Sequence, residues 1–383
     1  MSETKLLAYL VIVTLVLGGT GFVFSTVISP LSEGDLAVSS HEATLIYTLS
    51  SLLRYLATAA VILVPLSFLL IYRWFGRERK FTVPATLSTI PDAALKPWQV
   101  NLLFRKDALV FDESGYYATL LDLHRRKFIA FIPSQEGKAG VFLIRILKTS
   151  SDDQYEQRVL KVLDQIAENG LLDLGRFEKI TQEAKTSAAA EETVLRYQRM
   201  LTDLTIRADP TLAHQYIVDG RDHIVPLLLT SIVVFSISFM AIFLEPMQSS
   251  ILIPATFLWG VVVIQSLIAI AMPSALFGHW KDDKYRDKLQ WEAFTRFLSD
   301  LALMRKYVPE DLSTWGDWLV YGTALGVGDK VESAMAVLNV NMADTGVPVS
   351  ALGLGTAFSP LLHFKSPAHG RSGSSPRSGA HGR

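Results

Sequence analysis

Four long apolar runs dominate the pattern of hydrophobic and polar positions along the chain. They cover residues 6–28, 55–72, 224–244 and 251–273. Each is close to the roughly 20 apolar residues that a helix needs to cross a hydrocarbon core about 30 Å thick. None has the polar face that a long helix of a soluble protein shows. The pattern predicts a mainly α membrane protein with four transmembrane helices in two hairpins, within residues 1–74 and 223–274.

Positive charge is concentrated on one side of these runs. The basic flank consists of Arg77, Arg79, Lys80, Lys281, Lys284, Arg286 and Lys288. The short loops 29–51 and 246–250 contain no lysine or arginine. Because basic loops stay in the cytoplasm, we expect a multi-pass protein of the cell membrane with both termini cytoplasmic. The first apolar run is longer than that of a signal peptide, so we expect a retained helix.

The same basic flank has a second interpretation. At the anionic inner leaflet each lysine or arginine contributes about 1 kcal/mol of attraction near the surface. Setting the topology explains the flank most simply, and lipid recognition is the alternative. In either case the bilayer is a partner of the chain.

Between the two hairpins the apolar periodicity changes from helical to alternating. Residues 75–150 show two helical segments followed by two short strands, at 97–104, 113–127, 128–132 and 141–147. Turn-forming residues join the two strands. Two helices followed by a β-hairpin predict a cytoplasmic winged-helix-like α+β module.

The remaining polar segments have helical spacing. Residues 151–222 predict a cytoplasmic helical region that includes one long helix over 177–206. Residues 275–340 predict an aromatic-rich helical region. Its second helix opens at Pro309, because proline and acidic residues suit a first turn. Residues 341–383 are assigned to a low-complexity, disordered tail, which is rich in Ser, Gly and Pro from Lys365 onward.

Aromatic side chains recur at three- and four-residue spacing in residues 275–340. The set that shares these helix faces is Trp291, Phe294, Trp315, Trp318 and Tyr321. Such spacing places the side chains on one face of each helix. We expect the two helices to pack on each other and on the central region. The alternative is an exposed face that docks a partner or lies in the headgroup layer.

Several segments in fixed order resemble one family. They are "YYATLLDLHRRKFIAF", "WEAFTRFLSDL" and "WGDWLVYGTALGV", at 116–131, 291–301 and 315–327. They are similar to segments of the predicted membrane proteins of the domain of unknown function 2207 family (YciQ-like). The resemblance covers most of residues 52–338 and implies the architecture alone, because the family has no established activity. Many members carry a large extracytoplasmic β-rich domain, for which only residues 29–51 offer a place here.

Composition and motifs mainly exclude kinds of catalytic and metal-binding site. The chain has 383 residues, a formal net charge of −1 and no cysteine, so disulfides, thiolate metal sites and cysteine nucleophiles are ruled out. The histidines do not have the spacing of a zinc helix, and no G-x-S-x-G elbow occurs. "GTALGVGDK", at 322–330, lacks Walker spacing, and we expect a helix C-cap at Gly326 followed by an N-cap at Asp329. We expect no enzyme, catalytic residue, cofactor or metal site.

Three functions remain open. The first is a non-enzymatic scaffold or regulatory adaptor that presents cytoplasmic modules to protein partners. The alternative is a membrane-tethered DNA-binding regulator, in which Arg125, Arg126 and Lys127 contact nucleic acid; the same cluster would otherwise contact a protein. Nucleic acid is the less favoured partner, because basic and acidic residues are nearly balanced around that cluster. The third is a channel or transporter component, formed by a homo-oligomer, although the apolar runs contain no charged residue.

Overall fold

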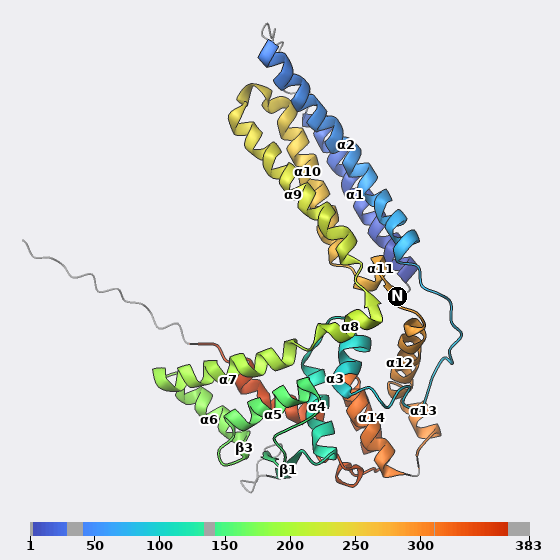
Figure 1. Ribbon diagram of the computed structural model, residues 1–383, viewed down its shortest axis with the longest axis vertical. Coiled ribbons are helices and arrows are strands. Elements are labelled where there is room, and N and C mark those ends of the chain that lie inside the picture. Colours follow the sequence, from blue (N-terminus) through green and yellow to red (C-terminus); the bar gives the residue numbers. More distant parts are fainter. Residues whose placement is uncertain (1–2, 29–40, 134–141, 310, 367–383) are drawn as a thin grey trace, which may run out of the picture. The chain divides into compact units, whose positions relative to one another are not determined.

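The computed structural model describes residues 3–28, 41–133, 142–309 and 311–366 (Figure 1). The chain is mainly helical and divides into two compact units. Unit 1 contains Met1–Ala85, Lys106–Val110 and Pro210–Ala293; unit 2 contains Thr86–Arg105, Phe111–Asp209 and Phe294–Arg383. These six segments alternate along the sequence, so the chain passes from one unit to the other five times.

Four long helices form most of unit 1. They are α1 (Glu3–Ile28), α2 (His41–Phe75), α9 (Arg221–Leu244) and α10 (Ser249–Ile270). All four are long and apolar enough to cross a membrane, which agrees with the predicted number of spans. Helix α10 packs against each of the other three, and Figure 1 shows the four running side by side.

Helix α2 includes the last part of one predicted loop. Helix α2 begins at His41 rather than at residue 55, so residues 41–51 extend the helix instead of forming the end of a loop. Arg54 directly precedes the predicted span, but arginine is a good helix former and one half-buried cation does not end a helix. Between α9 and α10 the predicted short turn is present as a single 3₁₀ turn, Pro246–Gln248.

Polar groups inside the four-helix bundle bond to one another. The Gln265 amide is fully buried, and its Nε2 donates to the carbonyl oxygens of Thr14 at 2.8 Å and Val61 at 3.2 Å. These bonds join α10 to α1 and α2. The hydroxyls of Ser238 and Thr256, 2.6 Å apart, join α9 to α10. Because a bilayer offers no water to such groups, helix-to-helix bonds favour association of the bundle.

Short elements close the polar end of unit 1. They are α8 (Pro210–Tyr216), β4 (Ile217–Val218), α11 (Ser274–Phe277), β5 (His279–Trp280) and the first part of α12 (Lys284–Leu298). Strands β4 and β5 pair antiparallel, with Ile217 opposite Trp280. A Cβ at Gly278 would lie 1.9 Å from the Val218 carbonyl oxygen, so only glycine permits this approach.

The inserted segment Lys106–Val110 contributes a carboxylate to this end of unit 1. Asp107 accepts hydrogen bonds from the backbone nitrogen of Ser274 at 2.9 Å and from its hydroxyl at 2.7 Å. It also pairs with the Arg221 guanidinium at 2.7 Å. One side chain therefore holds the first residues of α9 and α11.

Unit 2 is mainly helical and includes a three-stranded antiparallel sheet of order β1-β2-β3. Its first part contains α3 (Pro97–Val100), the π-helix η2 (Asn101–Arg105), α4 (Glu113–Arg125), β1 (Ile129–Pro133), β2 (Phe142–Ile146), α5 (Gln154–Ile166), β3 (Leu171–Asp173), α6 (Gly175–Glu183) and α7 (Ala188–Ile206). Its second part contains α13 (Leu301–Lys306), α14 (Leu312–Ala324), α15 (Gly328–Val337), the 3₁₀ turn η4 (Met342–Thr345) and α16 (Ala351–Leu362). The order of two helices and a hairpin agrees with the prediction for residues 97–147.

Capping residues divide helices that were predicted to be continuous. The helix predicted over 177–206 is two helices, because the Ser187 side chain caps α7. Asp300 caps α13, which separates it from α12. Helix α14 begins after the Asp311 cap rather than at Pro309. The C-cap of α14 is Leu325, one residue before the predicted Gly326, which has a left-handed φ of 76°. The N-cap of α15 is Val327, and the predicted cap Asp329 lies in its first turn.

The prediction of a disordered tail over 341–383 is wrong for its first part. Helix α16 buries Leu354, Phe358 and Leu361, which recur at four- and three-residue spacing. The ring of Phe358 lies 5.6 Å from that of Tyr116 and 5.8 Å from that of Phe177. The many small residues of α16 concealed this apolar face. Residues 367–383 lie outside the described part of the chain.

Helix α14 packs by its aromatic face inside unit 2. The Trp318 ring lies 5.1 Å from Trp315 and 5.0 Å from Phe297. Its Nε1 donates to the Ser88 carbonyl at 3.2 Å, and the Tyr321 hydroxyl donates to the Leu95 carbonyl at 2.8 Å. Segments far apart in sequence, before and after the second hairpin, thus share one core.

A buried carboxylate ties three further segments of unit 2 together. Glu156 on α5 is fully buried and pairs with Lys96 at 3.1 Å and with Arg126. It also accepts a hydrogen bond from the Ser151 hydroxyl. Burial acts to raise the pKa of Glu156, but the bonds from Ser151, Arg126 and Lys96 outweigh it and hold the pKa below the ordinary value of 4.5.

We expect Trp318→Ala to destabilise unit 2 by about 3–5 kcal/mol, the usual cost of truncating a buried tryptophan. Thermal melting and limited proteolysis of the full chain in detergent measure this loss. Trp74→Ala is the matched control, because Trp74 is 71 % exposed on α2. A melting curve that Trp318→Ala leaves unchanged would contradict the packing described for α14.

We expect Glu156→Gln to lower the melting temperature at neutral pH, and its difference from the native chain to shrink as pH falls. A carboxylate whose pKa is depressed on folding stabilises fully above the unfolded value of 4.5. That contribution is lost as pH falls through the lower folded pKa. Glu332→Gln is the control, because burial raises the pKa of Glu332 and its pH trend should have the opposite sign. A difference between Glu156→Gln and the native chain that is constant from neutral to acid pH would refute the assignment.

Candidate functional site

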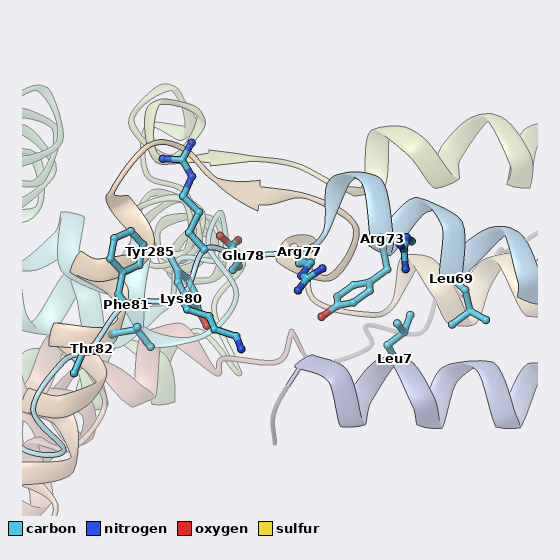
Figure 2. A pocket seen from close by; sticks show the side chains of 12 residues that line it. Leu7, Leu69, Arg73, Arg77, Glu78, Lys80, Phe81, Thr82 and Tyr285 are labelled. Carbon is cyan, nitrogen blue, oxygen red and sulfur yellow. The ribbon is translucent and has the colours of Figure 1, made fainter.

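An open pocket of about 900 Å³ lies at the polar end of unit 1; we call it the basic pocket (Figure 2). Its walls come from α1, the end of α2, the segment that follows α2, and α12. The lining residues are Leu7, Leu69, Tyr72, Arg73, Arg77, Glu78, Arg79, Lys80, Phe81, Thr82, Tyr285 and Leu289. All of them belong to unit 1.

The charge of the basic pocket is strongly positive. Arg73, Arg77, Arg79 and Lys80 are exposed, and none has an ion pair with an acid in the described part of the chain. The single acidic residue in the lining is Glu78, whose Oε1 accepts a hydrogen bond from the Trp280 backbone nitrogen at 2.7 Å. The lining thus carries an excess of three positive charges.

Three contacts hold the segment that follows α2 in place. A Cβ at Gly76 would lie 2.0 Å from the Leu276 carbonyl oxygen, so glycine allows the backbone to pass directly over α11. The bond from Trp280 to Glu78 fixes the next turn of the chain. The Phe81 ring then packs against Tyr285 of α12, with centroids 6.5 Å apart. The backbone that carries the basic side chains is therefore fixed by contacts within unit 1.

The basic pocket is graded from apolar to polar. In Figure 2, Leu7 of α1 and Leu69 of α2 lie at one end, and Phe81, Thr82 and Tyr285 at the other. The side chains of Arg77 and Lys80 lie between these ends, with Arg73 beside Leu69. An elongated amphipathic anion matches this order of groups.

The second half of the predicted basic flank is largely engaged within unit 1. The Lys281 Nζ donates to the His214 carbonyl at 2.6 Å. Lys284 pairs with Asp287 at 3.2 Å, and Lys288 lies 3.9 Å from a Glu292 carboxylate oxygen. Arg286 is exposed and does not line the basic pocket. A smaller pocket of about 310 Å³ brings Lys281 together with Arg77 and Arg79, so the two halves meet in part.

The basic cluster at the end of α4 is partly neutralised. Arg125 pairs with Asp317 of α14. Arg126 pairs with Asp122 at 2.8 Å and with Glu156. Lys127 is exposed and has a left-handed φ of 58°. Two of the three cations thus serve the packing of unit 2.

The five aromatic residues that the docking alternative would place on an exposed face are buried. The exposed fraction is zero for Trp291, Phe294 and Trp315, 2 % for Trp318 and 8 % for Tyr321. They line the inside of the fold and do not form a surface. No group of three or more His, Asp or Glu side chains among the described residues is arranged to hold a metal ion.

Sequence reasoning did not single out two residues that matter here. Arg73 lines the basic pocket, although the pattern marked it only as the boundary of a span. Its place in the last turn of α2, four residues before Arg77, was an available clue. Asp107 offered none, because its partners Arg221 and Ser274 are more than a hundred residues away.

Comparison with known proteins gives one finding. Residues 87–335, well over half of the chain, match the family model described as the C-terminal domain of a predicted membrane protein, DUF2207. No curated protein and no solved structure matches the chain significantly. The match includes α9 and α10 of unit 1 and most of unit 2, and it confirms the resemblance seen in the sequence. The chain belongs to the DUF2207 family of predicted membrane proteins.

Proposed function

We propose that the protein is a non-enzymatic membrane adaptor, in which four helices hold unit 2 at the cytoplasmic surface, where it binds protein partners. The observation that carries this proposal is the alternation of the two units along the chain. A module on a single linker can act far from the membrane. Unit 2 is joined to unit 1 by five covalent connections, which supports a module tethered to the membrane helices.

The cytoplasmic position of unit 2 is supported by charge. Arg73 lies in the last turn of α2, and Arg77, Arg79 and Lys80 follow that helix. The turn between α9 and α10 has no basic residue. Basic residues next to a span favour the cytoplasmic side. The same rule then assigns both termini to that side.

DNA binding is a weaker alternative. Two helices, a hairpin and a third strand, in the order that unit 2 has them, are compatible with a winged helix. Counterion release on DNA rewards free positive charge. Arg125 and Arg126 are instead paired with Asp317, Asp122 and Glu156. This favours a winged-helix-like module that binds protein.

A function in transport has less support than DNA binding. Within the described spans the buried amide of Gln265 donates to the Thr14 and Val61 carbonyls, as a packing residue does. Ionisable residues inside spans are the usual mark of an ion or substrate path. An oligomeric channel therefore ranks third.

Single cysteines test the orientation, since the native chain has none. Met247→Cys, at a position 74 % exposed in the turn between α9 and α10, should react with a membrane-impermeant maleimide in intact cells. Ser299→Cys, exposed in unit 2, should react only after permeabilisation. Labelling of Ser299→Cys in intact cells would place unit 2 outside and end the proposal.

Photo-crosslinking at one position in unit 2 and at one position in the turn between α9 and α10 tests whether unit 2 binds protein partners. A crosslinker at Leu352, which is 73 % exposed on α16, should capture discrete proteins in cells, and one at Met247 should not capture the same proteins. Capture of no protein, together with micromolar binding of duplex DNA by the full chain in physiological salt, would replace the adaptor by a DNA-binding regulator.

A further inference from the structure

We propose that the basic pocket binds the phosphate of an anionic glycerophospholipid from the adjoining leaflet, with the acyl chains directed along Leu7 and Leu69. This site belongs to unit 1 and does not depend on which side of the membrane unit 2 occupies. A failure of the adaptor proposal would therefore not contradict this one, and the reverse also holds.

The first step of the argument is charge. Four exposed cations line the basic pocket, and none has an ion pair in the part of the chain that the structure describes. Exposed like charges gathered on one short segment repel each other, and an anion relieves that repulsion. The guanidinium groups of Arg73, Arg77 and Arg79 match phosphate oxygens because their donors form a planar fork.

The second step is the contrast between the two halves of the basic flank. Setting the topology requires only that positive charges follow a span. Lys281, Lys284 and Lys288 meet that requirement while bonded to His214, Asp287 and Glu292. Arg77, Arg79 and Lys80 would set the topology equally well if they were paired, yet they have no ion pair with a described residue and they line a pocket. Topology alone does not explain this difference.

The third step is shape. About 900 Å³ is at the upper end of ligand pockets and exceeds what one phosphate needs. The Leu7 and Leu69 side chains continue the pocket on helices long and apolar enough to cross a membrane. The Phe81 and Tyr285 rings line the far end, and aromatic residues are favoured at the level of lipid headgroups. A headgroup joined to acyl chains fits this gradient better than a soluble anion.

The fourth step is rigidity. Gly76 passes against the Leu276 carbonyl, and Glu78 is bonded to Trp280, so the cations are held by the backbone of the pocket. A preformed site loses less conformational entropy on binding than a free basic tail. The site is thus expected to select one or a few lipids from the bulk leaflet.

Native mass spectrometry of the full chain in detergent tests the site by titration with phosphatidylglycerol and with phosphatidylcholine of the same acyl chains. We expect Arg77→Gln/Lys80→Gln to weaken phosphatidylglycerol binding about tenfold or more, since each cation near a lipid surface contributes roughly 1 kcal/mol. Phosphatidylcholine binding should change little. Lys5→Gln/Arg286→Gln is the matched control, because it removes two exposed cations of unit 1 that do not line the basic pocket.

Each outcome decides the question. An equal loss in both double variants shows general attraction to anionic lipid and overturns the pocket. Displacement of the lipid by millimolar inorganic phosphate assigns the site to a soluble anion and overturns the lipid assignment. Arg77→Lys/Lys80→Arg keeps both positive charges, so it should bind phosphatidylglycerol as the native chain does, unlike Arg77→Gln/Lys80→Gln. If this variant and the native chain melt alike but only the native chain binds, charge at this site is not the cause and the proposal fails.

Discussion

The polar end of unit 1 depends on the bonds that the Asp107 carboxylate makes with Ser274 and Arg221. It accepts hydrogen bonds from the backbone nitrogen and the hydroxyl of Ser274, the first residue of α11, and it pairs with Arg221 at the start of α9. Helix α11 is too short to be stable alone, since it has four residues. Its position therefore rests on this cap and on its neighbours.

The basic pocket follows from that position. The carbonyl of Leu276, the third residue of α11, is the surface over which Gly76 passes. Three residues after α11 ends, the Trp280 backbone nitrogen donates to Glu78 and orients the segment that carries the cations. The order of dependence thus runs from Asp107 to α11, then to the segment after α2, and finally to the lining of the basic pocket.

Asp107 itself is supplied by an insertion whose two ends meet in unit 2. The side chain of Asp112 receives a bond from the Asn101 amide at 3.0 Å and pairs with Arg105 at 2.9 Å. The Asn101 amide also donates to the Ala324 carbonyl of α14 at 2.8 Å. Asn101 and Arg105 begin and end a π-helix, a form that is rare and frequent at functional sites. Both ends of Lys106–Val110 are therefore anchored before the segment enters unit 1.

The features that sequence predicted are local ones. Four apolar runs, the hairpin of β1 and β2, and the left-handed Gly326 follow from composition or spacing within a few residues. The failures have local reasons as well. Ser187 and Asp300 cap new helices inside periodic stretches, and the small residues of α16 disguised its apolar face.

The candidate site was predictable only in part. The cations of the basic flank stood out as a run, so lipid recognition was already an alternative. Their gathering into a pocket was not predictable, because it rests on contacts such as Glu78 with Trp280, which are 202 residues apart. Such pairing depends on how the helices assemble, and no local period records it.

Hydrogen exchange of the full chain in lipid nanodiscs tests the role of Asp107 most directly. In Asp107→Ala the account predicts faster exchange of the amides from Ser274 to Trp280, with unchanged exchange in β1 and β2 of unit 2. Asp287→Ala, which removes a carboxylate paired with Lys284 elsewhere in unit 1, should leave the amides of α11 unchanged. Equal protection of Ser274 to Trp280 in Asp107→Ala and in the native chain would contradict the account.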